Sequence, residues 1–182
     1  MPMRCAAAAS RISRDPVNRA DLLSARRWFA LAAAIVVADQ IVKWIVLRNF
    51  APGEQRVLTD FFNLVLVFNK GAAFSLFAQA PGWQAPVLSA FAIAAAIVVS
   101  VFIVRSPGRQ ILCLGLALIL GGAIGNVIDR LRFGQVVDFL DFHALGWHWP
   151  AFNVADSAIS IGAVILILEG FIRREKQPGA AS

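Results

Sequence analysis

The stretch FNVADSAISIGAVILIL, residues 152–168, decides how the rest of the chain is read. Its apolar continuation predicts a membrane helix, yet Asp156 lies near its start. A carboxylate on a membrane helix is unfavourable by about 2.5 kcal/mol or more at the bilayer centre and by less toward the ends. Asp156 therefore requires a partner or a function.

The composition is that of an integral membrane protein. Of the 182 residues, 59% are hydrophobic and 15% are charged, and the mean hydropathy is +0.70. About 25% charged residues is usual for soluble domains. The net charge of +6 would also suit a nucleic-acid binder. However, the basic residues flank apolar runs in the positive-inside pattern, so we expect no nucleic-acid partner. They include Arg4, Arg11, Arg14, Arg19, Arg26, Arg27, Arg105, Arg109, Arg173, Arg174 and Lys176.

Four segments are long and apolar enough to cross a bilayer, which takes roughly 20 residues. The basic flanks put both termini in the cytoplasm and two connecting segments, 48–82 and 131–151, on the outer side. We expect a basic cytoplasmic tail over 1–27, a four-helix membrane domain over 28–174 that includes an outer β segment over 48–82, and a cytoplasmic tail over 175–182. The predicted spans are 28–47, 83–104, 110–130 and 152–172.

The two outer segments differ in pattern. TDFFNLVLVFNKGAAFSLF, residues 59–77, is rich in strand-forming residues and lies between two Pro-Gly pairs. It predicts a small extracytoplasmic β-sheet lying on the membrane surface. The segment 131–151 has aromatic residues that suit the membrane interface, and we interpret it as a loop. The predicted fold class is therefore an all-α membrane protein with four transmembrane helices and a small outer sheet.

Polar residues on three predicted helices fall at one depth, near the outer boundary. Asn153, Asp156, Ser157 and Ser160 have the spacing i, i+3, i+4 and i+7, which forms one stripe on a helix. Polar stripes on membrane helices face protein or trapped water rather than lipid. We therefore expect the groups to converge. The other groups are Asp39 with Lys43, and Asn126 with Asp129 and Arg130.

Structural explanations are open for each of these groups. Asn153 and Asp156 have the spacing of an N-cap and its acid three residues later. Asp39 and Lys43, at i and i+4, would form a neutralising ion pair. These roles do not by themselves explain why all the groups share one depth.

The remaining acids also have simple explanations. Asp129 could form an interfacial ion pair with its neighbour Arg130. Asp138 and Asp141, in GQVVDFLDF, could be solvated loop acids. The pattern therefore leaves open whether Asp129 or Asp138 is the partner of Asp156.

The same segments give little sign of other catalytic chemistry. His143 and His148 have no ligand spacing with a cysteine, so we expect no zinc site. No serine or cysteine lies beside a convincing histidine base, so a nucleophilic triad is not indicated. We expect neither a metal nor an organic cofactor.

Several carboxylates at a shielded water boundary favour proton chemistry. Two facing aspartates share one proton, and the pair can activate a water while protonating a carbonyl oxygen. A proton-coupled transporter is the alternative, although inverted repeats are absent and the acids lie at one face rather than the midplane. A membrane scaffold held in register by ion pairs is a third hypothesis.

Five blocks, in order, resemble the lipoprotein signal peptidases (signal peptidase II), which are integral-membrane aspartyl peptidases of bacteria. The resemblance covers residues 28–172. The blocks are ADQIVK (38–43), FNKGAAFS (68–75), GGAIGNVIDR (121–130), GQVVDFLDF (134–142) and FNVADSAISIG (152–162).

The resemblance implies removal of the signal peptide from prolipoproteins, immediately before the diacylglyceryl-modified cysteine. It also implies that Asp138 and Asp156 are the catalytic pair, which settles the choice between Asp138 and Asp129. No cofactor or metal is implied. The residues implied to bind substrate or support the site are Asp39, Lys43, Asn69, Gly71, Asn126, Asp129, Arg130 and Asn153.

The resemblance also implies where the protein acts and what it meets. It would be a multi-pass protein of the bacterial cytoplasmic (inner) membrane with its active site near the outer face, and we expect a monomer. Membrane lipids and the diacylglyceryl-modified precursors would be its partners. Globomycin-type cyclic peptides would inhibit it, and the outer sheet would be the family's β-cradle, which clamps the precursor.

Overall fold

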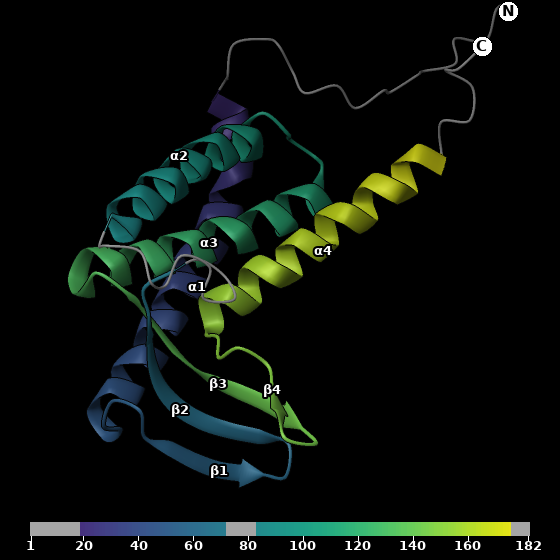
Figure 1. The fold of residues 1–182 in the computed structure, drawn as a ribbon. Helices are drawn as coiled ribbons and strands as arrows, with labels where there is room; N and C mark the ends of the chain where they lie inside the picture. The colour runs from purple at the N-terminus through teal and green to yellow at the C-terminus, as the bar shows by residue number, and fades with distance from the viewer. Residues whose placement is uncertain (1–18, 72–82, 176–182) are drawn as a thin grey trace, which may run out of the picture.

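The computed structural model describes residues 19–71 and 83–175 as a helical bundle with an antiparallel sheet beside one end (Figure 1). Expectations for 1–18, 72–82 and 176–182 lie outside the described residues. The helices are α1 (Arg19–Asn49), α2 (Gln84–Val104), α3 (Gln110–Phe133) and α4 (Val154–Glu175). The strands are β1 (Gln55–Thr59), β2 (Phe62–Asn69), β3 (Val136–Ala144) and β4 (Trp147–His148).

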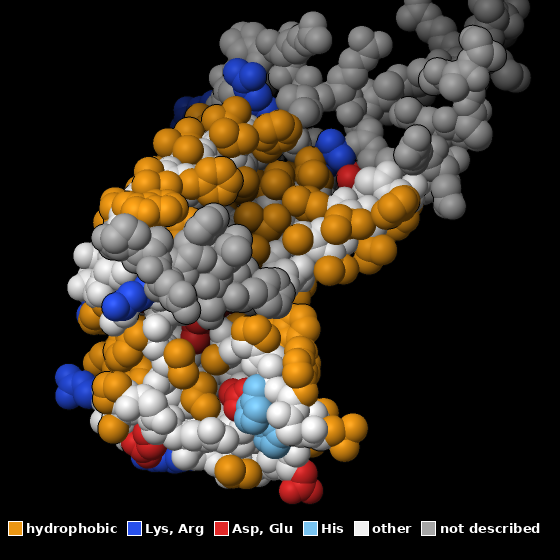
Figure 2. Space-filling model, viewed as in Figure 1, with side chains coloured by type: hydrophobic (Ala, Val, Ile, Leu, Met, Phe, Trp, Pro, Cys, Tyr) orange, Lys and Arg blue, Asp and Glu red, His pale blue; other side chains and the backbone are white. Residues whose placement is uncertain are grey.

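All four predicted membrane helices are confirmed as long and apolar enough to span a bilayer. Hydrophobic side chains cover much of the visible helical surface, as lipid contact requires (Figure 2). The first helix begins at Arg19 and not at Trp28. Its opening residues, RADLLSARR, include strong helix formers such as Ala, Leu and Arg, so the helix extends beyond the apolar run.

Helix α3 is the centre of the bundle. Over its most apolar window 56% of residues are buried, against 11–22% for the other three helices. Gly121 and Gly125 allow α1 to approach α3 closely: an added Cβ would lie 2.7 Å from the Ala32 carbonyl oxygen or from Asp39 Oδ2, respectively. Both neighbours belong to α1, so Gly121 lets the two backbones pack together and Gly125 leaves room for the Asp39 carboxylate.

The predicted small sheet is confirmed, but its extent differs from the expectation. Four antiparallel strands lie in the order β1-β2-β3-β4, and β3 and β4 come from the segment that we interpreted as a loop. The residues VVDFLDFHA of β3 include two valines and two phenylalanines, which favour a strand. Asp138 is therefore a strand residue, paired with Val67 of β2, and not a loop acid.

Two features fix β3 against the helices. Gly134 ends α3 in the left-handed region at φ 70°, so the chain turns sharply from α3 into β3. Val137 and Phe139 of β3 then pack with Val46 of α1 and Leu66 of β2 in a buried apolar cluster. The strand therefore places Asp138 at the end of the bundle beside the sheet.

Candidate active site

The predicted polar groups do converge, at the junction of β3, the start of α4 and the C-terminal halves of α1 and α3. Asp138 comes from β3 and is only 2% exposed. Asp156 lies in the first turn of α4 and is half-buried. Asn126, Asp129 and Arg130 come from the end of α3.

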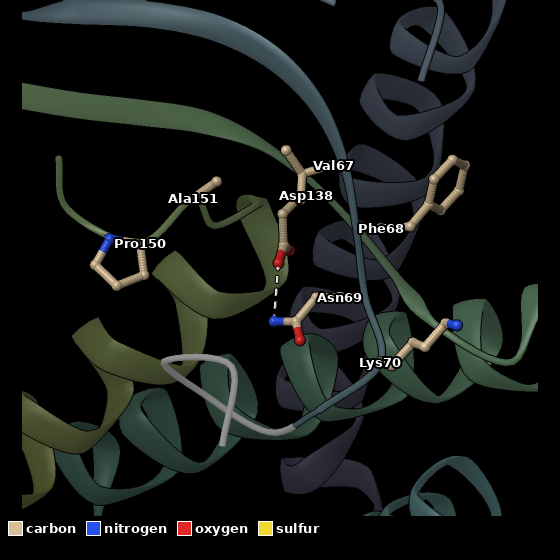
Figure 3. Close-up of a pocket in the computed structure, with 7 residues that line it drawn as sticks. All are labelled: Val67, Phe68, Asn69, Lys70, Asp138, Pro150 and Ala151. Atoms are coloured by element: carbon tan, nitrogen blue, oxygen red, sulfur yellow. Dashed lines mark hydrogen bonds between the residues drawn. The ribbon is translucent and has the colours of Figure 1, made fainter. Parts of the chain in front are cut away.

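Among the described residues, the hydrogen-bond donors to Asp138 are neutral side-chain amides. Asn153 Nδ2 donates to Oδ1 at 2.7 Å, and Asn69 Nδ2 donates to Oδ2 at 3.1 Å. The carboxyl lines a cavity of about 180 Å³ between β2 and the segment before α4, with Pro150 and Ala151 on the opposite side (Figure 3). Asp138 can therefore meet a small group or a water in this cavity.

The surroundings of Asp138 favour its protonated form. Burial is the largest cause, and the nearby carboxylate of Asp156 adds to it, so the pKa of Asp138 rises to about 7. The amides of Asn69 and Asn153 and the charge of Lys43 oppose this rise but do not cancel it. The carboxyl can therefore exchange a proton near neutral pH.

Asp156 is held by two asparagines. Asn126 Nδ2 donates to its Oδ1 at 2.7 Å, and its backbone N–H donates to Asn153 Oδ1 at 2.8 Å. The second contact confirms that Asn153 is the N-cap of α4. The capping role and the site role do not exclude one another, because the Nδ2 of the same Asn153 donates to Asp138. Asp156 is not among the residues that line the cavity beside Asp138.

Behind the two aspartates lies a buried ion cluster formed by Asp39, Gln40, Lys43 and Asp129, called here the support cluster. Lys43 Nζ lies 2.8 Å from Asp39 Oδ2, which confirms the predicted ion pair. It also lies 2.7 Å from Asp129 Oδ2. The hypothesis that Asp129 pairs with Arg130 is therefore wrong: Lys43 reaches Asp129 across the α1–α3 contact.

Asn69, Gly71 and Arg130 form the rim of the site. Asn69 Oδ1 accepts the Gly71 N–H at 2.9 Å, and Arg130 Nη2 donates to the Gly71 carbonyl at 3.2 Å. Arg130 also interacts electrostatically with Asp138 and Asp156. These contacts hold the end of β2 against α3 beside the cavity.

Sequence reasoning missed Gln40 and misjudged Asp141. Gln40 Nε2 donates to Asp129 Oδ1 at 3.0 Å and to Asp39 Oδ2 at 3.2 Å. A glutamine beside an aspartate in an apolar helix was the available signal. Asp141, expected to be a solvated loop acid, is buried and accepts a hydrogen bond from Asn63 Nδ2 at 2.8 Å.

The described residues, 19–71 and 83–175, contain no group of three or more His, Cys, Asp or Glu side chains that could hold a metal ion. His148 instead pairs through Nδ1 with Asp141 Oδ2 at 2.9 Å. The ring of His148 also stacks on His143.

The chain matches known proteins over most of its length. The family model described as signal peptidase (SPase) II matches residues 31–172. A lipoprotein signal peptidase of Paraburkholderia phytofirmans is 52% identical over 142 residues, which are 78% of this chain and 83% of the relative. One from a Janthinobacterium species is 54% identical over 142 residues, 78% of this chain and 86% of the relative.

Solved structures agree with the sequence matches. One, described as a bacterial membrane enzyme, has a TM-score of 0.75 and 27% identity and covers 86% of this chain and 94% of its own. A second, with the same description, has a TM-score of 0.69 and 28% identity and covers 79% and 91%. The chain therefore belongs to the signal peptidase II family and is a multi-pass membrane peptidase.

Proposed function

We propose that this chain removes the signal peptide from bacterial prolipoproteins by aspartate-activated water, cutting immediately before the diacylglyceryl-modified cysteine. The observation that carries the proposal is that one side chain, Asn153, contacts both acids. Its Nδ2 donates to Asp138, and its Oδ1 accepts the backbone N–H of Asp156. One side chain thereby ties a strand acid to a helix acid. Family membership supplies the precursor as substrate.

The chemistry requires one proton on the pair. The ionised aspartate removes a proton from a water, whose oxygen bonds to the scissile carbonyl carbon, and the protonated aspartate donates to the carbonyl oxygen. The aspartate that took the water proton then gives it to the leaving nitrogen, the other aspartate takes a proton back from a hydroxyl of the tetrahedral intermediate, and the C–N bond breaks. The raised pKa of Asp138, about 7, supports a pair that still holds one proton near neutral pH.

The rim residues position the substrate. The Asn69 amide lines the same cavity as Asp138, and the Arg130 guanidinium contacts the neighbouring Gly71 carbonyl, so both could donate to peptide carbonyls of a bound precursor. Lys43, Asp39 and Asp129 support the pair from behind. Globomycin-type cyclic peptides would occupy the same cavity and compete with the precursor.

The membrane sets the depth of the reaction. We place both termini in the cytoplasm and the site near the outer face of the inner membrane, where the lipidated cysteine of a precursor lies. The hairpin tip between β3 and β4 is apolar and exposed: Leu145 is fully exposed, and Trp147 and Trp149, which follow it, are exposed as well. Such residues suit the lipid headgroup region, so the sheet would rest on the outer surface.

The sequence expectations for organisation stand as part of the proposal. The working unit is a monomer whose four-helix peptidase domain covers residues 28–174, between two cytoplasmic tails. No contact with a second copy is needed to complete the acid pair, because both aspartates and the three asparagines that contact them come from one chain.

The test is cleavage by the full chain, reconstituted with a diacylglyceryl-modified precursor. Asp138→Asn and Asp156→Asn should each abolish release of the signal peptide while the protein remains folded. Asp141→Asn is the matched control, since Asp141 lies on the same strand as Asp138 but contacts neither candidate catalytic residue in the described structure.

Other outcomes identify the alternatives. Cleavage by either site variant at the wild-type rate would refute the acid pair. Proton flux without cleavage would identify a transporter, and neither activity would identify a scaffold.

A further inference from the structure

The two acids of the support cluster hold the backbone directly before each candidate catalytic aspartate. Asp39 Oδ1 accepts the N–H of Ala155 at 2.9 Å, and Ala155 precedes Asp156. Asp129 Oδ2 accepts the N–H of Val137 at 3.1 Å, and Val137 precedes Asp138. Both contacts are buried, so one supporting carboxylate fixes the backbone directly before each candidate catalytic aspartate.

Lys43 joins these two fixed points. Its ammonium group lies 2.8 Å from Asp39 and 2.7 Å from Asp129, and the side chain is 2% exposed. The third polar contact is with the Asn126 Oδ1 at 3.2 Å. An ammonium has three donors, so these acceptors use all of them.

The contact with Asn126 extends to the catalytic carboxyls themselves. Because Asn126 Oδ1 faces Lys43, the amide nitrogen must face Asp156, to which it donates at 2.7 Å. Asn126 Oδ1 also accepts from Asn153 Nδ2 at 3.3 Å, and that same nitrogen donates to Asp138 at 2.7 Å. Lys43 therefore orients the amides that donate to both acids.

We propose that Lys43 is a positioning residue that sets the separation and the amide partners of Asp138 and Asp156. The inference rests on the proposed function, because it concerns how that acid pair is held. Lys43 acts through the backbone clamps of Asp39 and Asp129 and through the Asn126 amide, and it does not touch the reacting atoms.

The charges around the pair explain why a cation is needed at this point. Asp39 comes from α1, Asp129 and Arg130 from α3, Asp138 from β3 and Asp156 from α4. With Lys43, the support cluster carries one net negative charge. Without it, two buried carboxylates would repel each other, and their backbone clamps would separate.

Gln40 provides a matched control for a purely structural role. Its amide donates to both supporting acids and to the Gly125 carbonyl at 3.3 Å, but it contacts neither asparagine among the described hydrogen bonds. Gln40→Leu should therefore weaken the support cluster without releasing the Asn126 amide.

The experiment compares Gln40→Leu with the double variant Lys43→Met/Asp39→Asn in the full chain. The double variant keeps the net charge of the cluster, and the amide oxygen introduced at position 39 can still accept the Ala155 N–H. We expect its kcat to fall about tenfold to a hundredfold with little change in KM, since hydrogen bonds to charged groups have that effect when lost. Gln40→Leu should lower the thermal midpoint and change kcat less than about threefold.

The pH–rate profile is a second measurement, and a purely structural role of Lys43 would leave its shape unchanged. Repulsion between the two acids separates the two apparent pKa values of the pair. The width of the bell-shaped curve of rate against pH therefore depends on the distance between the two carboxyl groups. In the double variant Lys43 no longer joins the two clamps or orients the Asn126 amide, so the two acids should move apart and the bell-shaped profile should narrow. Its width should be unchanged in Gln40→Leu. Equal kcat and equal width in the two variants would overturn the proposal.

A second charge-preserving variant, Lys43→Met/Asp129→Asn, repeats the test from the other clamp and should narrow the bell as well. If both double variants fail to fold while Gln40→Leu folds, the result also counts against the proposal, because it makes Lys43 a folding residue. A wild-type protein that cleaves no precursor would instead refute the proposed function.

Discussion

Two aspartates of strand β3 behave in opposite ways. Asp138 and Asp141 are both buried, at 2% and 6% exposed, and the sequence VVDFLDF gives no sign of a difference between them. Yet the pKa of Asp138 is raised to about 7 and the pKa of Asp141 is lowered. Burial pushes both pKa values upward, so the difference comes from the partners.

The partners differ in charge and in cover. Asp138 lies between sheet and helices, receives two neutral amides and faces another carboxylate, Asp156. Asp141 receives the Asn63 amide and the ring of His148, which is itself half-exposed to water. Hydrogen bonds and a partner that can become positive outweigh burial at Asp141, and a negative neighbour reinforces burial at Asp138.

The comparison separates a carboxyl that can do proton chemistry from one that stabilises the sheet. A shifted pKa near 7 is useful to a catalyst, whereas a lowered pKa keeps an acid ionised and paired. The visible sheet surface in Figure 2 carries acidic and histidine side chains, so charge alone does not mark the site. The following predictions test this contrast.

The largest expected effect is on cleavage. Asp138→Asn should reduce the rate of precursor cleavage by a factor of at least about 10³, because it removes an acid–base group. Asp141→Asn should leave the rate within about threefold. Release of the signal peptide, followed by gel shift, measures the rates of both variants. An active Asp138→Asn protein would contradict the different roles assigned to Asp138 and Asp141.

The cleavage rate should depend on pH as the raised pKa of Asp138 requires. With Asp138 ionising near pH 7, the cleavage rate should fall above about pH 7, approaching tenfold per pH unit. Initial rates between pH 5 and pH 9 test this limb. A rate that stays level to pH 9 would contradict the assignment of Asp138.

Stability should respond in opposite directions at the two positions. Folding raises the pKa of Asp138 above its ordinary 3.8, so its contribution to the free energy of unfolding falls as pH rises from about 4 to about 7. Folding lowers the pKa of Asp141, so its contribution is present above about pH 4 and is lost as pH falls further. Thermal midpoints of Asp138→Asn and Asp141→Asn against wild type at pH 3.5, 5 and 8 measure both trends.

The two roles of Asn153 can be separated by one substitution. Serine is a good N-cap but has no amide to donate to Asp138, so Asn153→Ser should keep stability and lose about tenfold to a hundredfold in cleavage rate. Asn153→Ala should in addition lose about 1 kcal/mol of stability. Equal cleavage by wild type and Asn153→Ser would show that the amide contact is unimportant.

The smallest effect is expected at the outer end of β3. His148→Ala removes an ion-pair partner that is half-exposed, so it should lower stability by less than about 1 kcal/mol. The cleavage rate should not change. Denaturant or thermal titration at neutral pH measures the loss, and a large drop in activity would mean that the two ends of β3 are coupled.

The sequence predicted the helices and the convergence of their polar groups, because apolar length and basic flanks are local signals. It did not predict β3, since VVDFLDFHA follows a helix without a hairpin turn to announce a strand. It also left Asp129 and Asp138 as equal candidates. Telling these two candidates apart depends on Lys43, which is far from both in the chain and forms an ion pair with Asp129.

The clamp on Ala155 has a consequence for how the protein is made. Asp39 enters the membrane with the first helix, but the N–H that it accepts arrives only with the last one. A chain halted after its third helix, at Phe133, has neither Asp138 nor Asp156 and cannot close the clamp. On the proposed mechanism, the nascent enzyme is therefore inert until its last helix has been made and packed.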